Sequence, residues 1–187
     1  SRIGSSEAVP QLPAYDPSWY EESYAMAQQT FDAMSALSAD DDVTRRARQV
    51  VLDDMTTTIA RSRTHESERT LSQISSPVAD IRQIFELMPV ATLEQQEFFL
   101  ERLASVPDAL RGVQETWQVT KERGELPALR HIMGVADQAH EYSAGDFESL
   151  VQRTMHVSQL SNELGRAARA AQDAYGQLAE WMRDRKS

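Results

Sequence analysis

Apolar residues recur at steps of three and four along most of the chain, which is the spacing that predicts amphipathic helices. Asp16 and Pro17 are typical of a helix start, because the carboxylate caps free backbone amides and proline suits the first helical position. We predict that this first helix runs to about Leu37. A second helix is predicted to begin at the acidic run 40–42 and to end after Arg63. It carries one apolar stripe: Val43, Ala47, Val50, Val51 and Ile59.

Five more helices are predicted downstream, each introduced by capping or turn residues. In chain order they begin at Ser76, Thr92, Ser105, Pro127 and Gly145. Met88–Pro89 should end the third helix, because proline disfavours helical geometry in the residue before it, and Gly124 should end the fifth. The last helix is predicted to be the longest, from Phe147 toward Trp181. Its second half carries an apolar seam of the coiled-coil kind, made of Val157, Leu160, Leu164, Ala167, Ala171, Ala174, Leu178 and Trp181.

No segment alternates apolar and polar residues over several positions, and the seven glycines are too scattered to mark a series of hairpins. The predicted fold is therefore all-α, with about seven helices in an irregular antiparallel bundle and a long C-terminal helix. Residues 1–15 are rich in Ser, Pro and Gly and are predicted to form an extended or mobile N-terminal arm. Residues 16–187 are predicted to form a single all-helical domain.

The composition describes one soluble domain or two small ones, and a chain of 187 residues can bury about 70% of the surface that it exposes when unfolded. The absence of cysteine excludes disulfides, thiolate metal sites and a cysteine nucleophile. A net charge of −10 argues against binding to nucleic acid or to an anionic membrane, because both require a positive face. The acidity is concentrated in residues 1–42, which hold eight acidic side chains and one basic one.

No run approaches the roughly 18–20 apolar residues of a membrane span. The first thirty residues also lack the basic start and apolar run of a signal peptide. We therefore expect a cytoplasmic protein. Because the sequence begins at Ser1 and not at methionine, a removed signal is left open.

The segment from His65 to Arg69 begins like the H-E-x-x-H motif of zinc proteases, in which two histidines one helical turn apart hold the metal. Arg69 stands where the second histidine is needed, and a guanidinium cannot ligate a cation. We interpret this segment as a solvated helix end.

Asp137, His140 and Glu141 would share one helix face and could supply ligands or an acid–base pair, but a surface cluster is the favoured interpretation. His131 and His156 are isolated and are interpreted as polar rim residues. No G-x-S-x-G elbow and no Gly-rich phosphate loop are present. We therefore predict no catalytic, cofactor-binding or metal-binding residue in this chain.

The aromatic residues near the N-terminus and the arginine clusters have similarly plain interpretations. The aromatic group consists of Tyr15, Trp19, Tyr20 and Tyr24. It could line a pocket, but it is more typical of core or docking residues. The arginines within 45–48 and 61–63 have acidic neighbours and are expected to form salt bridges.

The stretch from Ser76 to Pro89, SPVADIRQIFELMP, is more specific than the rest of the chain. Together with residues 98–110, which include the turn Leu103–Pro107, and the 130–141 helix, it resembles the N-terminal part of a large bacterial family designated domain of unknown function 885, common in actinobacteria. The resemblance covers roughly residues 15–187. It implies a helical protein related to zinc metallopeptidases of the gluzincin type, with the H-E-x-x-H motif far downstream of this region.

The leading hypothesis is therefore a helical N-terminal domain of a zinc-dependent peptidase-like hydrolase. Such a domain would be inactive alone, would shape or cover the substrate cleft, and would have its own C-terminal catalytic portion as partner. Zinc is expected only in that downstream portion.

The rival hypothesis is a free-standing helical interaction module that docks another protein through the Trp181 seam or the N-terminal aromatics. Exposed apolar helix faces would also allow self-association. A four-helix carboxylate metal bundle ranks last, because it needs paired E-x-x-H motifs that the sequence lacks.

Overall fold

The computed structural model describes residues 11–71, 75–155 and 159–184, and within these ranges it contains eight helices and no strand. The helices are α1 (Pro17–Ala36), α2 (Asp42–Arg63), α3 (Pro77–Leu87), α4 (Leu93–Ala104), α5 (Val106–Glu122), α6 (Leu129–Ser143), α7 (Asp146–Met155) and α8 (Ser161–Asp184). The prediction of an all-α fold is confirmed. None of the helices in these ranges is long and apolar enough to cross a membrane.

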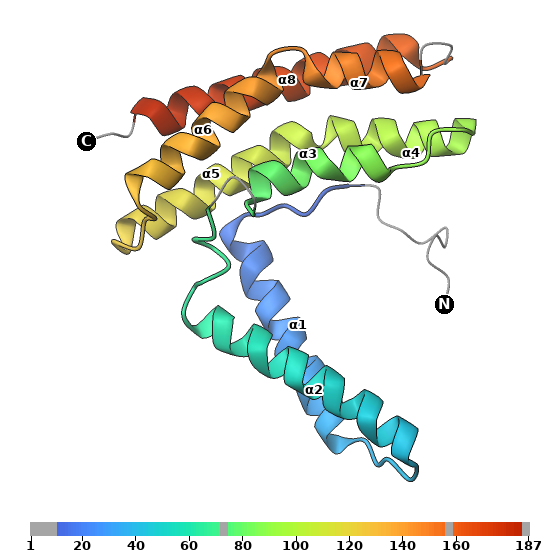
Figure 1. The fold of residues 1–187 in the computed structure, drawn as a ribbon, viewed down its shortest axis with the longest axis vertical. Coiled ribbons are helices and arrows are strands. Elements are labelled where there is room, and N and C mark those ends of the chain that lie inside the picture. The colour runs from blue at the N-terminus through green and yellow to red at the C-terminus, as the bar shows by residue number, and fades with distance from the viewer. Residues whose placement is uncertain (1–10, 72–74, 156–158, 185–187) are drawn as a thin grey trace.

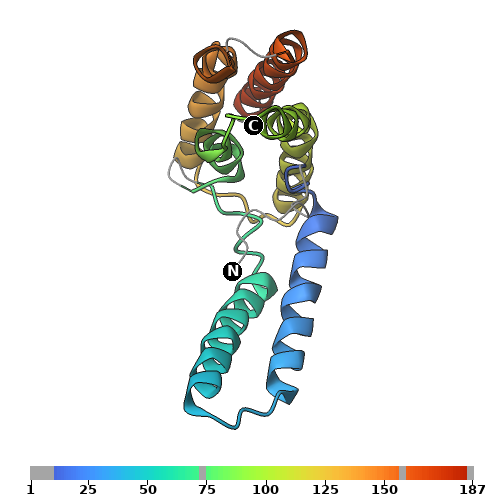
Figure 2. The ribbon, with the colours of Figure 1, turned by 90° about the vertical axis from the view of Figure 1, so that its right-hand side faces the viewer.

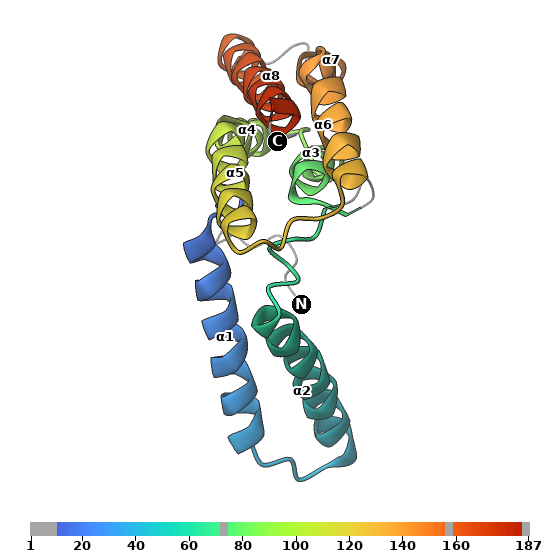
Figure 3. The ribbon, with the colours of Figure 1, turned by 90° about the vertical axis from the view of Figure 1, so that its left-hand side faces the viewer.

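The helices form two parts that differ in shape. Helices α3 to α8 pack together as a bundle, while α1 and α2 form an antiparallel hairpin that extends away from it (Figures 1 and 2). The hairpin meets the bundle at the N-terminal end of α1, beside α5 (Figure 3). The greater part of both hairpin helices therefore has no second layer of the bundle against it.

The hydrophobic core lies inside the bundle around α8, which packs against α4, α5, α6 and α7. Three phenylalanine rings and one tyrosine ring meet there, each at most 2% exposed: Phe85, Phe99, Phe147 and Tyr175. Phe85 lies edge-on to Phe99 and Phe147, with ring centroids 5.2 and 5.7 Å apart. The Tyr175 hydroxyl donates a hydrogen bond of 2.9 Å to the backbone oxygen of Val78, so the polar end of this buried ring is satisfied.

The apolar seam predicted on the last helix faces this core. Its buried members are Leu164, Ala167, Ala171 and Leu178; Leu160, Ala174 and Trp181 pack against the core while partly exposed, and Val157 lies outside the described residues. The chain's own helices therefore occupy the place that a partner would need on this seam.

The long C-terminal helix is present as α8, but it does not begin at Phe147 as predicted. Residues 146–155 form the separate helix α7, residues 159–160 are in a turn, and α7 and α8 pack against each other. Spacing alone could not reveal this fold-back, because the apolar pattern is helical on both sides of the turn. A single helix of this length would span about 50 Å and leave the buried Phe147, Leu150 and Val151 without a covering layer.

The SPVADIRQIFELMP stretch forms α3 and contributes to packing. The Ser76 hydroxyl caps the helix by accepting a hydrogen bond of 3.2 Å from the Ala79 amide, and Pro77 occupies the first turn. Arg82 is 5% exposed and forms an ion pair with Asp146 at the start of α7. The stretch is thus a helix with one buried face, fixed to a second helix by an ion pair.

The hairpin is held mainly by one inner row on each helix, spaced as in a coiled coil. On α1 this row contains Tyr20, Tyr24, Ala27, Phe31 and Met34, and on α2 it contains Arg48, Val51, Leu52, Met55 and Ile59. Only Tyr20 and Ala27 are fully buried in the hairpin helices. The single apolar stripe predicted for α2 is therefore wrong in part, because Val43 and Val50 are 78% and 69% exposed.

Candidate functional site

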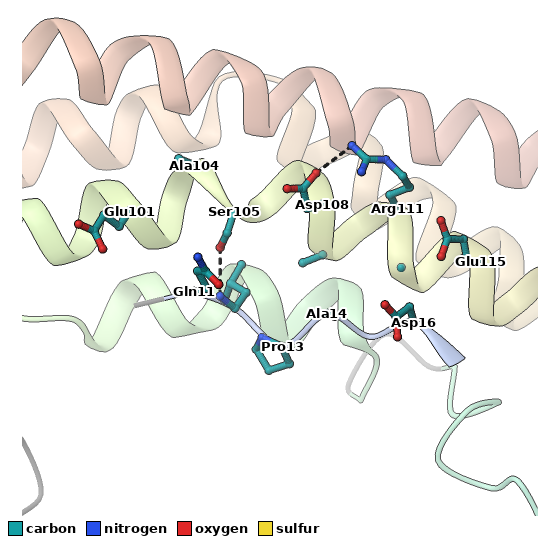
Figure 4. Close-up of a pocket in the computed structure, with 13 residues that line it drawn as sticks. Gln11, Pro13, Ala14, Asp16, Glu101, Ala104, Ser105, Asp108, Arg111 and Glu115 are labelled. Atoms are coloured by element: carbon teal, nitrogen blue, oxygen red, sulfur yellow. Dashed lines mark hydrogen bonds and ion pairs between the residues drawn. The ribbon is translucent and has the colours of Figure 1, made fainter. Parts of the chain in front are cut away.

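An open groove of about 600 Å³ runs between residues 11–16 and the helices α4 and α5 (Figure 4). Residues 11–15 are extended and form one side, and the α4–α5 junction forms the other. The groove lies on the bundle, next to the point where α1 begins. It is larger than a second hollow, of about 40 Å³, that Leu71, Trp117 and Trp181 help to line.

The extended segment lies close to α5 because α5 carries a glycine at the crossing point. A Cβ atom on Gly112 would come within 1.9 Å of the Ala14 backbone oxygen, so any other residue would push the segment away. Two hydrogen bonds fix the segment, from the Leu12 amide to the Ser105 hydroxyl at 3.0 Å and from the Thr116 hydroxyl to the Tyr15 backbone oxygen at 2.7 Å.

The charged groups that line the groove are mostly acidic. Four carboxylates take part: Asp16, Glu101, Asp108 and Glu115. Asp108 forms an ion pair of 2.8 Å with Arg111, the only cationic side chain in the described lining, and Asp16 caps α1 by accepting from the Trp19 amide at 2.7 Å. The remaining negative charge favours a cationic ligand group over an anionic one.

A buried carboxylate, Glu68, joins the hairpin to the bundle. The side chain is 6% exposed and accepts hydrogen bonds from three directions: His65 Nδ1 at 2.8 Å, the Tyr24 hydroxyl on α1 at 3.3 Å, and Arg123 Nη1 after α5 at 2.5 Å. Because Tyr24 belongs to the hairpin and Arg123 to the bundle, Glu68 connects the two parts. We call these four residues the joint.

Burial by itself would raise the pKa of Glu68, but the hydrogen bonds and charges of His65 and Arg123 outweigh it and hold the pKa below its usual value. Glu68 is therefore an ionised acceptor at neutral pH. Burial, reinforced by the charge of Glu68, raises the pKa of Tyr24 to about 12, so this phenol remains a neutral donor. A charged acceptor that meets donors from both parts is suited to holding the hairpin and the bundle together.

The backbone is unusual at both connections of the hairpin. Tyr15, just before α1, has φ of 55°, and His65, just after α2, has φ of 52°; among the described residues these are the only non-glycine positions with positive φ. Such conformations cost about 1 kcal/mol or more and persist where neighbouring contacts hold them. The hydrogen bonds to Tyr15 and His65 are such contacts.

The segment that begins like H-E-x-x-H lies in a turn after α2. Glu66 forms an ion pair with Arg61 at 3.1 Å, and His65 Nδ1 is already bonded to Glu68. With Arg69 in the second histidine position and no helix to align the side chains, these residues do not fit a zinc ion. No group of three potential metal ligands was found in ranges 11–71, 75–155 and 159–184.

The other sequence candidates are dispersed. Asp137 forms an ion pair with Arg183 at 2.8 Å, whereas His131, His140 and Glu141 are exposed, and His156 lies outside the described residues. The N-terminal aromatics pack together: the rings of Tyr15 and Trp19 are 5.1 Å apart and those of Trp19 and Tyr20 are 4.9 Å apart. They line the connection between hairpin and bundle, not a pocket.

Two important features were missed from the sequence. Glu68 carries no local signal, because its partners Tyr24 and Arg123 lie 44 and 55 residues away. Gly112 did carry one, since a glycine in the middle of a helical pattern indicates a close backbone approach.

Comparison with known proteins identifies the family. The model of the family described as "Bacterial protein of unknown function (DUF885)" matches residues 1–187, which is the whole chain. The chain therefore belongs to this family. No match was found among the curated proteins.

Proposed function

We propose that this member of the DUF885 family is the non-catalytic helical N-terminal portion of a zinc-dependent peptidase-like hydrolase, in which the acidic groove forms one wall of the substrate cleft. The reaction class comes from the resemblance of family members to gluzincin-type metallopeptidases. The observation that supports the role of this portion is the open groove of about 600 Å³ beside residues 11–16.

The groove has properties of a binding wall. It is large enough for several side chains of a peptide, and most of its charged groups are carboxylates. Such a wall would favour peptides with lysine or arginine near the cleaved bond. The zinc ligands and the general base would come from the catalytic portion, because residues 65–69 do not fit a zinc ion.

The reading frame beyond the codon for Ser187 tests the first part of the proposal. An H-E-x-x-H codon run downstream is the expected result, and a stop codon directly after this region would contradict it. Zinc content and peptide hydrolysis of the purified 187-residue chain give an independent test. Tight zinc binding together with peptide cleavage by this chain alone would also contradict the proposal.

The role of the groove is tested in the longer gene product. Glu101→Gln and Glu115→Gln together should raise KM for cationic peptides and leave the zinc content unchanged. Glu66→Gln removes another exposed carboxylate, one outside the groove, and is the control. An equal change of KM in both variants would mean that the groove is not a wall of the substrate cleft.

A second candidate function is a free-standing helical module that binds another protein. The observation that favours it is the set of exposed apolar side chains on the hairpin: Met26, Leu37, Val43 and Val50. A stop codon after Ser187, together with a stable and soluble chain, would favour this candidate over the first.

A further inference from the structure

The two connections between the hairpin and the bundle are built alike. On each of them, a residue with positive φ lies between a hairpin helix and a leucine buried in the core of the bundle. Leu12 precedes Tyr15 and the start of α1, and Leu71 follows His65 and the end of α2. The bundle therefore holds the chain up to the positive-φ residue on each connection, and the hairpin begins just beyond it.

Tyr15 and His65 have the properties of hinge residues, which are a few positions at the ends of elements whose backbone angles can change. With φ of 55° and 52°, both residues have a conformation that costs about 1 kcal/mol or more relative to the negative-φ regions. A change to negative φ would recover this energy and redirect the adjoining helix. Because the hairpin is attached at both positions, it can turn as one body about the line that joins them.

The contacts that oppose such a turn are unequal. The helices α1 and α2 pack against each other along most of their length, whereas α1 meets the bundle near its start, beside α5 (Figure 3). Farther along α1, the Tyr24 hydroxyl donates to Glu68 at 3.3 Å, which is longer than the usual distance of about 2.7–2.8 Å. On the bundle side, the Arg123 guanidinium donates to the same carboxylate at 2.5 Å. A turn of the hairpin would therefore break the weaker bond to Tyr24 and leave Glu68 bound to Arg123.

We propose that the hairpin is an arm that turns as one body about a hinge at Tyr15 and His65. In the docked position, which the structure shows, Tyr24 binds Glu68; in the undocked position this bond is broken. A ligand or partner that binds one position better than the other would shift the balance between them. The proposal does not depend on the proposed function.

The length of the arm sets the size of the movement. Helix α1 has 20 residues, so its far end lies about 30 Å from the hinge, and a turn of about 20° moves that end by about 10 Å. The same turn moves Tyr24 by about 5 Å, which is enough to break its hydrogen bond. Tyr20, a buried residue in the first turn of α1, moves by only about 2–3 Å, so its packing near the hinge is disturbed least.

Distances between spin labels test the motion in the 187-residue chain, which has no cysteine of its own to compete for the label. Ser38→Cys in the distal turn and Gln177→Cys on α8 are exposed positions whose labels report the hairpin relative to the bundle. We expect two distances, one for each position of the arm. Tyr24→Phe removes the hydroxyl and keeps the ring, so it should raise the ratio of undocked to docked molecules about two- to fivefold.

Tyr142→Phe is the matched control. It removes another half-buried phenol hydroxyl, which accepts a hydrogen bond from Gln138 within α6, and it should leave the ratio unchanged. A second pair of labels, at Glu22→Cys on α1 and Arg46→Cys on α2, runs diagonally across the hairpin at exposed positions. This pair should give one distance in every variant, because the hairpin turns as one body.

Three results would overturn the proposal. The first is a single distance between the labels at positions 38 and 177 that Tyr24→Phe does not change. The second is an equal effect of Tyr142→Phe on the ratio of the two distances. The third is a changed distance between the labels at positions 22 and 46 in Tyr24→Phe, which would mean that the two helices of the hairpin separate or unfold.

Discussion

The longest helix of the bundle and the longer helix of the hairpin are similar in length, yet they bury very different numbers of residues. Helix α8, with 24 residues, has nine buried residues, whereas α2, with 22 residues, has none in the structure. A helix in the bundle has neighbours on several sides, while each hairpin helix packs along most of its length against the other hairpin helix. Because tertiary packing supplies most helix stability in proteins, the bundle should be stable by itself and the hairpin should depend on its connections.

The largest expected effect is a cavity in the bundle. Phe85→Ala removes a ring that is 2% exposed and contacts two other aromatic rings, so it should lower the free energy of unfolding by about 3–5 kcal/mol. Val43→Ala on the hairpin should change it by less than about 0.5 kcal/mol, because Val43 is 78% exposed. Urea denaturation followed by circular dichroism measures both. Similar losses of unfolding free energy in the two variants would mean that side-chain burial does not distinguish the bundle from the hairpin.

The next largest effect should come from the joint. Glu68→Gln keeps the shape of the side chain but removes the charge that pairs with Arg123, which should cost about 1.5–3 kcal/mol. The loss should appear first in the hairpin, as faster amide hydrogen exchange in α1 and α2 than in α8.

Glu66→Gln is the matched control for this substitution. Glu66 is exposed and its ion pair with Arg61 joins α2 to the turn that follows it, without crossing to the bundle. Such a pair contributes about 0–1 kcal/mol. If Glu68→Gln and Glu66→Gln accelerated hydrogen exchange equally, Glu68 would not be what holds the hairpin to the bundle.

A smaller effect is expected where residues 11–16 cross α5. Gly112→Ala should displace this segment and the buried Leu12. The lost burial should lower the free energy of unfolding by about 1.5–3 kcal/mol. The higher helix propensity of alanine should offset about 1 kcal/mol of this loss. The net destabilisation should be about 0.5–2 kcal/mol. Gly165→Ala on α8 has space for a Cβ and should be neutral or stabilising. Thermal unfolding of both variants checks the difference in sign.

Local signals predicted the helices of both parts well. The Asp16 cap, the Thr92–Gln95 capping box and the stop near Gly124 are all present, because each depends on atoms within a few residues of one another. The α7–α8 turn was not predicted, since a helical pattern continues on both of its sides. The position of this turn depends on contacts between distant parts of the chain, which local spacing does not encode.

The same reasoning explains why the candidate site could be predicted only in part. Spacing identified the apolar residues of α2 but not which neighbour would cover them, so the exposure of Val43 and Val50 was unexpected. Glu68 lay inside a segment interpreted as a solvated helix end, and only the folded chain brings Tyr24 and Arg123 to it. Side-chain chemistry is visible in a sequence, whereas burial depends on tertiary structure.

The pH dependence of the joint should give the smallest effect and the most specific one. Because the folded pKa of Glu68 lies below the unfolded value of 4.5, its stabilisation is complete above that value and is lost as pH falls through the folded pKa. The Glu68→Gln variant lacks this carboxylate, so the difference in unfolding free energy between the two proteins should shrink as pH falls below about 4.5. A difference that stayed constant from pH 7 to pH 3 would mean that the Glu68 charge does not stabilise the joint, and that shape alone holds the hairpin in place.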